Sequence, residues 1–246
     1  MARIWLTHRF GLHPLSAPGP GTGLANLGFS QGPYQSLNLG LRVGDDPGVV
    51  KRNRDQLKTL LELKELRFMD QIHGIDLEVV EDFSAPESQA DALFLKRSTN
   101  AGQSSALAVQ VADCIPVIIE SEDLIGAIHI GRTGLTRGIA EVAAGFALSK
   151  VPAEKLEVYL GPSICGDCYQ VSPEIYGEIV AKYPAAGYKE KENKIDIAAA
   201  LIEILEGFNI SWNWFSGERI CVSCAREFFS YRRDKVAGRQ AMIVSY

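Results

Sequence analysis

The segment LAVQVADCIPVIIESEDLIGAIHIG, residues 107–131, is the stretch that decides the fold. Two long apolar runs flank a polar tip, ESED at residues 120–123, which is the pattern of a β-hairpin. Both runs are apolar on both faces, so we expect a buried sheet covered by helices. If the first and last residues of the tip pair with each other, the same register sets Cys114 directly opposite His129.

This pairing of a cysteine with a histidine predicts a metal site. Directly opposed strand residues have Cβ atoms about 4.5–5.5 Å apart, close enough for a thiolate and an imidazole to bind one ion. A further candidate ligand is His73, in Gln71-Ile72-His73-Gly74. Two imidazoles and one thiolate leave a fourth tetrahedral position free, as in catalytic zinc sites. A water molecule in that position would have its pKa lowered to about 7 and would become a nucleophile at neutral pH.

Each of these residues also has a simpler interpretation. A histidine before a glycine is often a turn residue, and a free cysteine is most often a buried structural thiol. A metal-free dyad is a further alternative, in which His129 deprotonates Cys114 to make a nucleophilic thiolate. We favour zinc because a simple dyad would not need His73, although a metal-free triad could use it.

Composition limits the classes of function. With 246 residues and 46% hydrophobic content, the chain can bury one large core or two small ones. It has no apolar run near the roughly 18 residues of a membrane span and no cleavable apolar signal, so we expect a cytoplasmic protein without membrane contact. A net charge of -5 without a long basic run argues against nucleic acid and favours a small-molecule substrate. Four histidines are too few for a multi-copper oxidase.

Outside the hairpin, the pattern alternates between short strands and helices. Apolar spacing and capping residues predict helices near 47–62, 135–150, 173–183 and 196–206. Short apolar runs predict strands at 77–80, 91–95, 156–160 and 241–244.

A second set of cysteines forms two C-x-x-C pairs, Cys165 with Cys168 and Cys221 with Cys224. Two such pairs normally indicate a structural zinc site with four cysteine ligands. The stretch between the pairs is longer than the usual zinc-finger spacing, so unbonded thiols in the core and a single disulfide stay open as alternatives.

Eight segments, in order along nearly the whole chain, resemble the YfiH/YlmD-type laccase-domain family, also called purine nucleoside phosphorylase-like or peptidoglycan-editing factor proteins. The segments are GFS (28–30) with GPY (32–34), SLNLG (36–40), GDD (44–46) with NR (53–54), QIHG (71–74), ADCIPV (112–117), HIG (129–131), GPSI (161–164) and FSYRR (229–233).

The resemblance implies a fold, a metal and an activity. The fold is a single α+β domain over residues 1–246, an α/β sandwich with mixed sheets between helical layers. The metal is a zinc ion held by His73, Cys114 and His129, which would also be the catalytic residues. The activity is phosphorolysis of adenosine, inosine and methylthioadenosine, together with adenosine deamination. By the same resemblance, the residues expected to contact the nucleoside or phosphate are Asn38, Arg54 and Arg232.

The chain departs from the family pattern in two places. Where the family usually has His-Ala-Gly-Trp-Arg-Gly, residues 129–134 read HIGRTG, which loses the tryptophan and moves the arginine by one position. The segment between Arg9 and Gly28 is also longer than usual. Two other functions stay open: an amidase or peptide-editing hydrolase acting on a cell-wall precursor, and a non-catalytic metal-binding protein.

Overall fold

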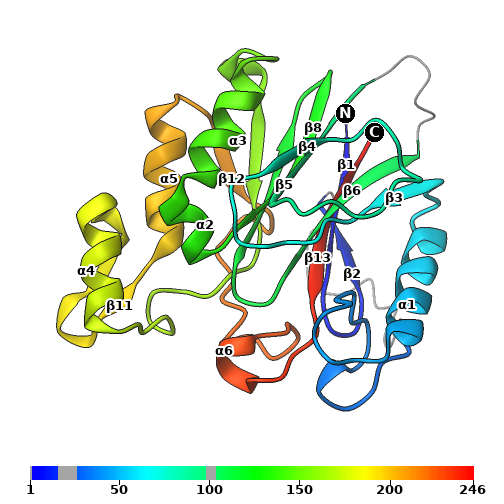
Figure 1. Ribbon diagram of the computed structural model, residues 1–246, viewed down its shortest axis with the longest axis horizontal. Coiled ribbons are helices and arrows are strands. Elements are labelled where there is room, and N and C mark those ends of the chain that lie inside the picture. Colours follow the sequence, from blue (N-terminus) through cyan, green and yellow to red (C-terminus); the bar gives the residue numbers. More distant parts are fainter. Residues whose placement is uncertain (1, 16–26, 98–103) are drawn as a thin grey trace.

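The computed structural model describes residues 2–15, 27–97 and 104–246. Two mixed β-sheets pack face to face, and helices cover the outer side of each sheet (Figure 1). This arrangement confirms the predicted α+β fold with mixed sheets between helical layers. Most of the segment expected to be longer than usual in the family, between Arg9 and Gly28, lies outside the described residues.

The five-stranded sheet has the order β2-β1-β13-β6-β3 and contains β1 (Arg3–Thr7), β2 (Leu12–Pro14), β3 (Glu65–Arg67), β6 (Ser105–Val111) and β13 (Gln240–Ser245). The six-stranded sheet has the order β12-β9-β7-β8-β5-β4 and contains β4 (Leu77–Val79), β5 (Ala92–Lys96), β7 (Ile115–Glu120), β8 (Leu124–Ile130), β9 (Glu157–Leu160) and β12 (Trp212–Trp214). A small third sheet pairs β10 (Gly187–Lys189) with β11 (Lys194–Ile195). The α-helices are α1 (Pro47–Leu60), α2 (Arg132–Arg137), α3 (Ile139–Leu148), α4 (Pro173–Lys182), α5 (Ile197–Gly207) and α6 (Tyr231–Asp234).

Three apolar layers hold the fold together. Between the sheets, Val109 and Met242 belong to the same buried cluster as Ile118. On the outer side of the five-stranded sheet, Leu57 of α1 packs in a cluster with Ile243. The largest cluster lies between the six-stranded sheet and the helices α3, α4 and α5. No helix in the described ranges has the length and apolar character needed to cross a membrane.

The hairpin differs from the prediction in register. His129 lies opposite Pro116, not Cys114, so the predicted pairing is wrong. The reason is the tip: the backbone N–H of Ser121 donates to the carbonyl of Leu124, which closes the turn one residue later on each strand. The partner of His129 therefore moves by two residues along the chain. Because strand side chains alternate with a period of two, Cys114 remains on the same face as His129.

The first apolar run of the hairpin is two strands rather than one. It begins in β6 of one sheet, crosses over at residues 112–114, and continues as β7 in the other sheet. At the crossing Asp113 has φ +99°, a left-handed conformation that side chains other than glycine rarely adopt. Cys114 therefore lies where the chain passes from one sheet to the other.

The predicted helices are present, with one correction. Side chains of Asp46, Ser172 and Asp196 cap the N-termini of α1, α4 and α5. The helix predicted over 135–150 is broken into α2 and α3 at Gly138, whose φ is +102°. A glycine takes this conformation without steric cost, so the chain ends one helix and starts the next at this residue.

Candidate metal centre

A side chain from the loop at residues 71–74 meets two side chains from one end of the hairpin. One ligand atom each from His73, Cys114 and His129 lies within 4.8 Å of the other two. The Cys114 Sγ is 4.0 Å from the Nε2 of His73, and the two imidazole rings stand edge to face with centroids 4.8 Å apart. The structure thus brings together the three residues predicted as metal ligands.

Asp91 orients both histidines. It is completely buried directly before β5, and its Oδ1 accepts a hydrogen bond of 2.7 Å from the Nδ1 of His129. The same carboxylate accepts bonds from the backbone N–H groups of Ile72, His73 and Gly74. These bonds hold the loop in which His73 has φ +57°. Since Nδ1 of His129 donates to Asp91, its Nε2 is left as the free ligand atom.

Charge within this group shifts two pKa values. Burial alone would raise the pKa of the Cys114 thiol, but the charge and hydrogen bond of His129, with help from His73, outweigh burial and lower it to about 6. Burial would lower the pKa of His129, and the opposing charges of Cys114 and Asp91 raise it to about 9. The environment therefore favours a thiolate, which is the form of cysteine that binds metal ions.

Gly131 leaves room for this cluster. A Cβ at this position would lie 2.8 Å from Cδ2 of His73 and 3.1 Å from Sγ of Cys114. Any larger residue would push the two ligands out of place. Two imidazoles and one thiolate with Asp91 behind His129 form a donor set suited to zinc, with room for one more ligand. The residues present therefore fit the metal that the resemblance implies.

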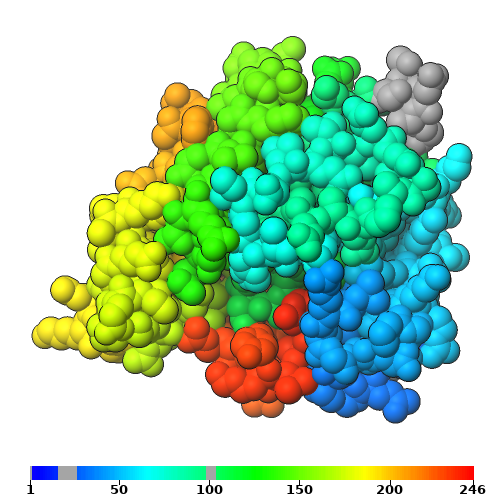
Figure 2. All heavy atoms as spheres, viewed as in Figure 1, coloured from blue at the N-terminus to red at the C-terminus, as the bar shows by residue number. Residues whose placement is uncertain are grey.

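The cluster opens into a cavity of ≈ 780 Å³. The surface is hollowed where the N-terminal, central and C-terminal segments meet (Figure 2). Four arginines line the cavity, namely Arg42, Arg54, Arg232 and Arg239. Burial lowers the pKa of Arg54 and of Arg239, yet guanidinium groups stay protonated at neutral pH. The cavity therefore offers fixed positive charge beside the three candidate ligands.

The three predicted substrate contacts have different positions. Arg54 and Arg232 line the cavity, whereas Asn38 is buried outside its wall. The Asn38 amide bonds to Asp45 and to the backbone of Arg239, so it holds that arginine's segment in place. Arg54 bonds to Glu87 and stacks on a phenylalanine ring, which restrains its guanidinium.

Several residues of the cavity were not predicted from the sequence. Asp113 accepts hydrogen bonds from the Ser230 hydroxyl and the Arg232 backbone N–H, so it joins the segment of Cys114 to α6. Tyr169 lines the cavity with the guanidinium of Arg232 over its ring. Asp91, which is buried and does not line the cavity, was also not predicted, although the sequence offered a signal: a carboxylate directly before a buried apolar strand.

Comparisons with known proteins identify relatives along almost the whole chain. The family model described as multi-copper polyphenol oxidoreductase laccase matches residues 23–246. A purine nucleoside phosphorylase of Streptomyces coelicolor is 36% identical over 223 residues, covering 87% of this chain and 89% of that protein. A purine nucleoside phosphorylase of Corynebacterium glutamicum is 32% identical over 224 residues, covering 88% of this chain and 89% of that protein.

Solved structures show the same fold. A Neisseria meningitidis protein, NMB0706, superposes with a TM-score of 0.81 at 29% identity, covering 99% of this chain and 93% of that one. YlmD from Geobacillus stearothermophilus superposes with a TM-score of 0.81 at 25% identity, covering 99% and 91%. The chain therefore belongs to the YfiH/YlmD-type laccase-domain family, whose model is described as multi-copper polyphenol oxidoreductase laccase.

Proposed function

We propose that this protein is a zinc-dependent purine nucleoside phosphorylase that acts on adenosine, inosine and methylthioadenosine and also deaminates adenosine. The observation that carries the proposal is the position of His73, Cys114 and His129 on the wall of a cavity that arginines also line. The names of the curated relatives support the substrate class.

The proposed metal would be held by Nε2 of His129, Sγ of Cys114 and the His73 ring. When bound, zinc supplies a Lewis acid at the cavity wall. The protein's own contribution there is to fix the ligands: Asp91 sets the tautomer of His129, and Gly131 leaves space for the His73 and Cys114 side chains.

Phosphorolysis sets two demands on the remaining residues. Inorganic phosphate attacks the anomeric carbon of the sugar, the glycosidic C–N bond breaks, and the base leaves with the bonding electrons. Arg232 and Arg239, which line the cavity with Cys114, supply positive charge for the phosphate. Both arginines are held in place, Arg232 by its contacts with Gln170 and Tyr169 and Arg239 by bonds to its own loop. Such preorganised cations stabilise charge without reorganisation during the reaction.

The test is base release from the three nucleosides with and without phosphate, on protein whose zinc content is measured in the same sample. We expect phosphate-dependent base release that is lost in Cys114→Ala, together with the loss of adenosine deamination. Val142→Ala, an exposed change on α3, is the control and should retain both activities. Either activity at the wild-type rate in Cys114→Ala would refute the single-site proposal.

A second assay separates the hydrolase alternative. A zinc-loaded protein that turns over no nucleoside but cleaves a nucleotide-linked amino-sugar peptide would be a peptide-editing hydrolase instead. A protein that binds zinc and turns over neither substrate would be a non-catalytic metal-binding protein.

A further inference from the structure

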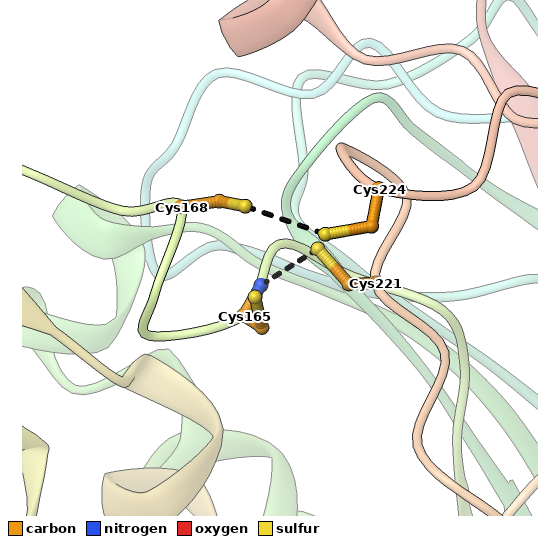
Figure 3. A group of neighbouring side chains, drawn as sticks. All are labelled: Cys165, Cys168, Cys221 and Cys224. Atoms are coloured by element: carbon orange, nitrogen blue, oxygen red, sulfur yellow. Dashed lines mark hydrogen bonds between the residues drawn. The ribbon is translucent and has the colours of Figure 1, made fainter.

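The two C-x-x-C pairs come together at a place separate from the first cluster. The Sγ atoms of Cys165, Cys168, Cys221 and Cys224 all lie within 4.8 Å of one another. Figure 3 shows the four side chains converging from two loops that are far apart in the sequence. None of these cysteines takes part in a disulfide. The long stretch between the pairs, which argued against a shared site, is therefore no obstacle.

The backbone explains how the two loops meet. Ser163 forms a parallel β-bridge with Cys221, in which the N–H of Ser163 donates to Ile220 and the N–H of Val222 donates back to Ser163. Each C-x-x-C segment then turns sharply, because its second cysteine N–H bonds to the carbonyl of its first cysteine. This pair of bridged turns directs all four thiols to one point.

Hydrogen bonds from backbone and side chain stabilise the second turn. The guanidinium of Arg233 donates to the carbonyls of Val222, Ser223 and Ala225, which fixes the loop that carries Cys221. The N–H of Cys165 donates to Sγ of Cys221 at 3.3 Å, a contact that stabilises negative charge on sulfur. The second turn is thus held in place by an arginine outside the cluster and by the backbone of the first turn.

The spacing fits one metal ion. In a tetrahedral site with Zn–S bonds of about 2.3 Å, the sulfur atoms lie about 3.8 Å apart. The Sγ atoms of Cys168 and Cys224 are 3.5 Å apart. Four thiolates this close require a cation, since their mutual repulsion would otherwise keep them protonated. Soft thiolate ligands in a tetrahedral arrangement select zinc or iron, and zinc is the ion of closed structural sites.

We propose that Cys165, Cys168, Cys221 and Cys224 bind a structural zinc ion, distinct from the one proposed at His73, Cys114 and His129. With four protein ligands this second site has no open position for a substrate. It joins two loops that the fold also connects through the β-bridge of Ser163 with Cys221 and through the bond from the Cys165 N–H to Sγ of Cys221.

The location gives this ion a further role. Tyr169 follows Cys168 directly and lines the cavity, and Arg232 packs on its ring while bonding to the Gln170 carbonyl. The ion would therefore hold the cavity wall that carries Tyr169 and Arg232. The role of this wall in substrate binding rests on the proposed function, whereas the binding of zinc by the four cysteines does not.

Metal counting on purified protein tests the proposal. We expect about two zinc ions per chain in the wild type, one in Cys114→Ala, and one in the double variant Cys168→Ser/Cys224→Ser. Cys114→Ala is the informative variant, because the chain has five cysteines and this change leaves only the four in question. Its cobalt-substituted form should show the intense thiolate-to-cobalt absorption of a four-sulfur site, and a mercurial titrated against four thiols should release its zinc.

Three outcomes would overturn the proposal. The first is Cys114→Ala protein without metal whose four thiols react freely. The second is a disulfide among these cysteines, found by alkylation and mass spectrometry without reductant. The third is iron in place of zinc. None of these readouts uses turnover, so the two proposals can fail independently. A Cys114→Ala protein that loses nucleoside activity but keeps one zinc ion would still support the four-cysteine site.

Discussion

Asp91→Asn is the sharpest test of how the first cluster is built. Oδ1 of Asp91 accepts from His129 at 2.7 Å and from the His73 N–H at 3.1 Å. Oδ2 accepts from the Gly74 N–H at 2.7 Å and from the Ile72 N–H at 3.2 Å. An asparagine has the same shape but only one acceptor oxygen, and its NH₂ group would face two donors. With the NH₂ group toward Ile72 and Gly74, two of the four hydrogen bonds are lost. With the NH₂ group toward His73 and His129, the His73 bond is lost and the His129 bond survives only if Nδ1 becomes the acceptor.

The magnitude follows from those two bonds. A hydrogen bond to a charged group contributes about 1.5–3 kcal/mol, so two of them amount to about 3–6 kcal/mol. Ile72 and His73 are exposed, so water can replace part of the loss, and we expect the free energy of unfolding of the metal-free protein to fall by about 2–4 kcal/mol. If the NH₂ group faces His129, Nδ1 becomes an acceptor and Nε2 carries the proton, so His129 must change tautomer before it can bind the metal. We therefore expect zinc affinity to fall by roughly 10–100-fold.

Urea unfolding of the chelated protein measures the first effect, and competition with a chromogenic chelator measures the second. Asp55→Asn, which removes an exposed carboxylate from α1, is the matched control and should change neither quantity. An Asp91→Asn variant that unfolds at the wild-type urea concentration and binds zinc with wild-type affinity would refute the role assigned to this carboxylate.

Three further substitutions have defined outcomes. Gly131→Ala places a methyl group 2.8 Å from the His73 ring and should lower zinc affinity roughly ten-fold or more, measured by chelator competition; unchanged affinity would contradict the described packing. Arg232→Ala should raise the KM for phosphate at least several-fold in base-release kinetics, and an effect on the nucleoside KM alone would assign Arg232 to the base or sugar instead. Burial and the charge of Glu157 on the neighbouring strand raise the pKa of Glu120. The ionised Glu120 carboxylate therefore lowers the free energy of unfolding once the pH rises above the pKa that this group has in the unfolded chain. Glu157→Gln should therefore stabilise the protein at pH 7 by about 0.2–1 kcal/mol in urea unfolding, with the gain vanishing below about pH 4; equal gains at both pH values would show that charge is not the cause.

The sequence predicted the face of the hairpin better than its register. Strand side chains alternate between the two faces of a sheet, so a shift by an even number of residues leaves each side chain on its face. The partner of His129 differs from the predicted one by two residues, and the prediction that Cys114 and His129 share a face therefore holds. The register itself depends on which residues close the turn. Here the hydroxyl and N–H of Ser121 both bond to Leu124, and one serine in a run of four polar residues gives no clear sign of that choice.

The apolar pattern of the sequence could not predict where the chain crosses from one sheet to the other. Apart from Gln110, the residues on both sides of 112–114 are apolar as far as Ile119, because β6 and β7 are both buried on two faces. Only Asp113 marks the change of sheet, and its carboxylate is explained by partners more than a hundred residues away, Ser230 and Arg232. Contacts between residues so far apart in the chain leave no pattern in the sequence around Asp113.

The crossing also explains why a reactive pair can exist inside this core. A cysteine within β6 or β7 would lie flat against apolar neighbours, where burial raises its pKa and keeps it inert. At the crossing the backbone leaves one sheet before it joins the other, and the glycine at position 131 keeps the opposing side open. Cys114 can therefore turn toward His73 and the cavity while His129, buried beside it, stays bonded to Asp91. The site is thus a consequence of building two packed sheets from one stretch of chain, since Cys114 lies where that stretch passes from one sheet to the other.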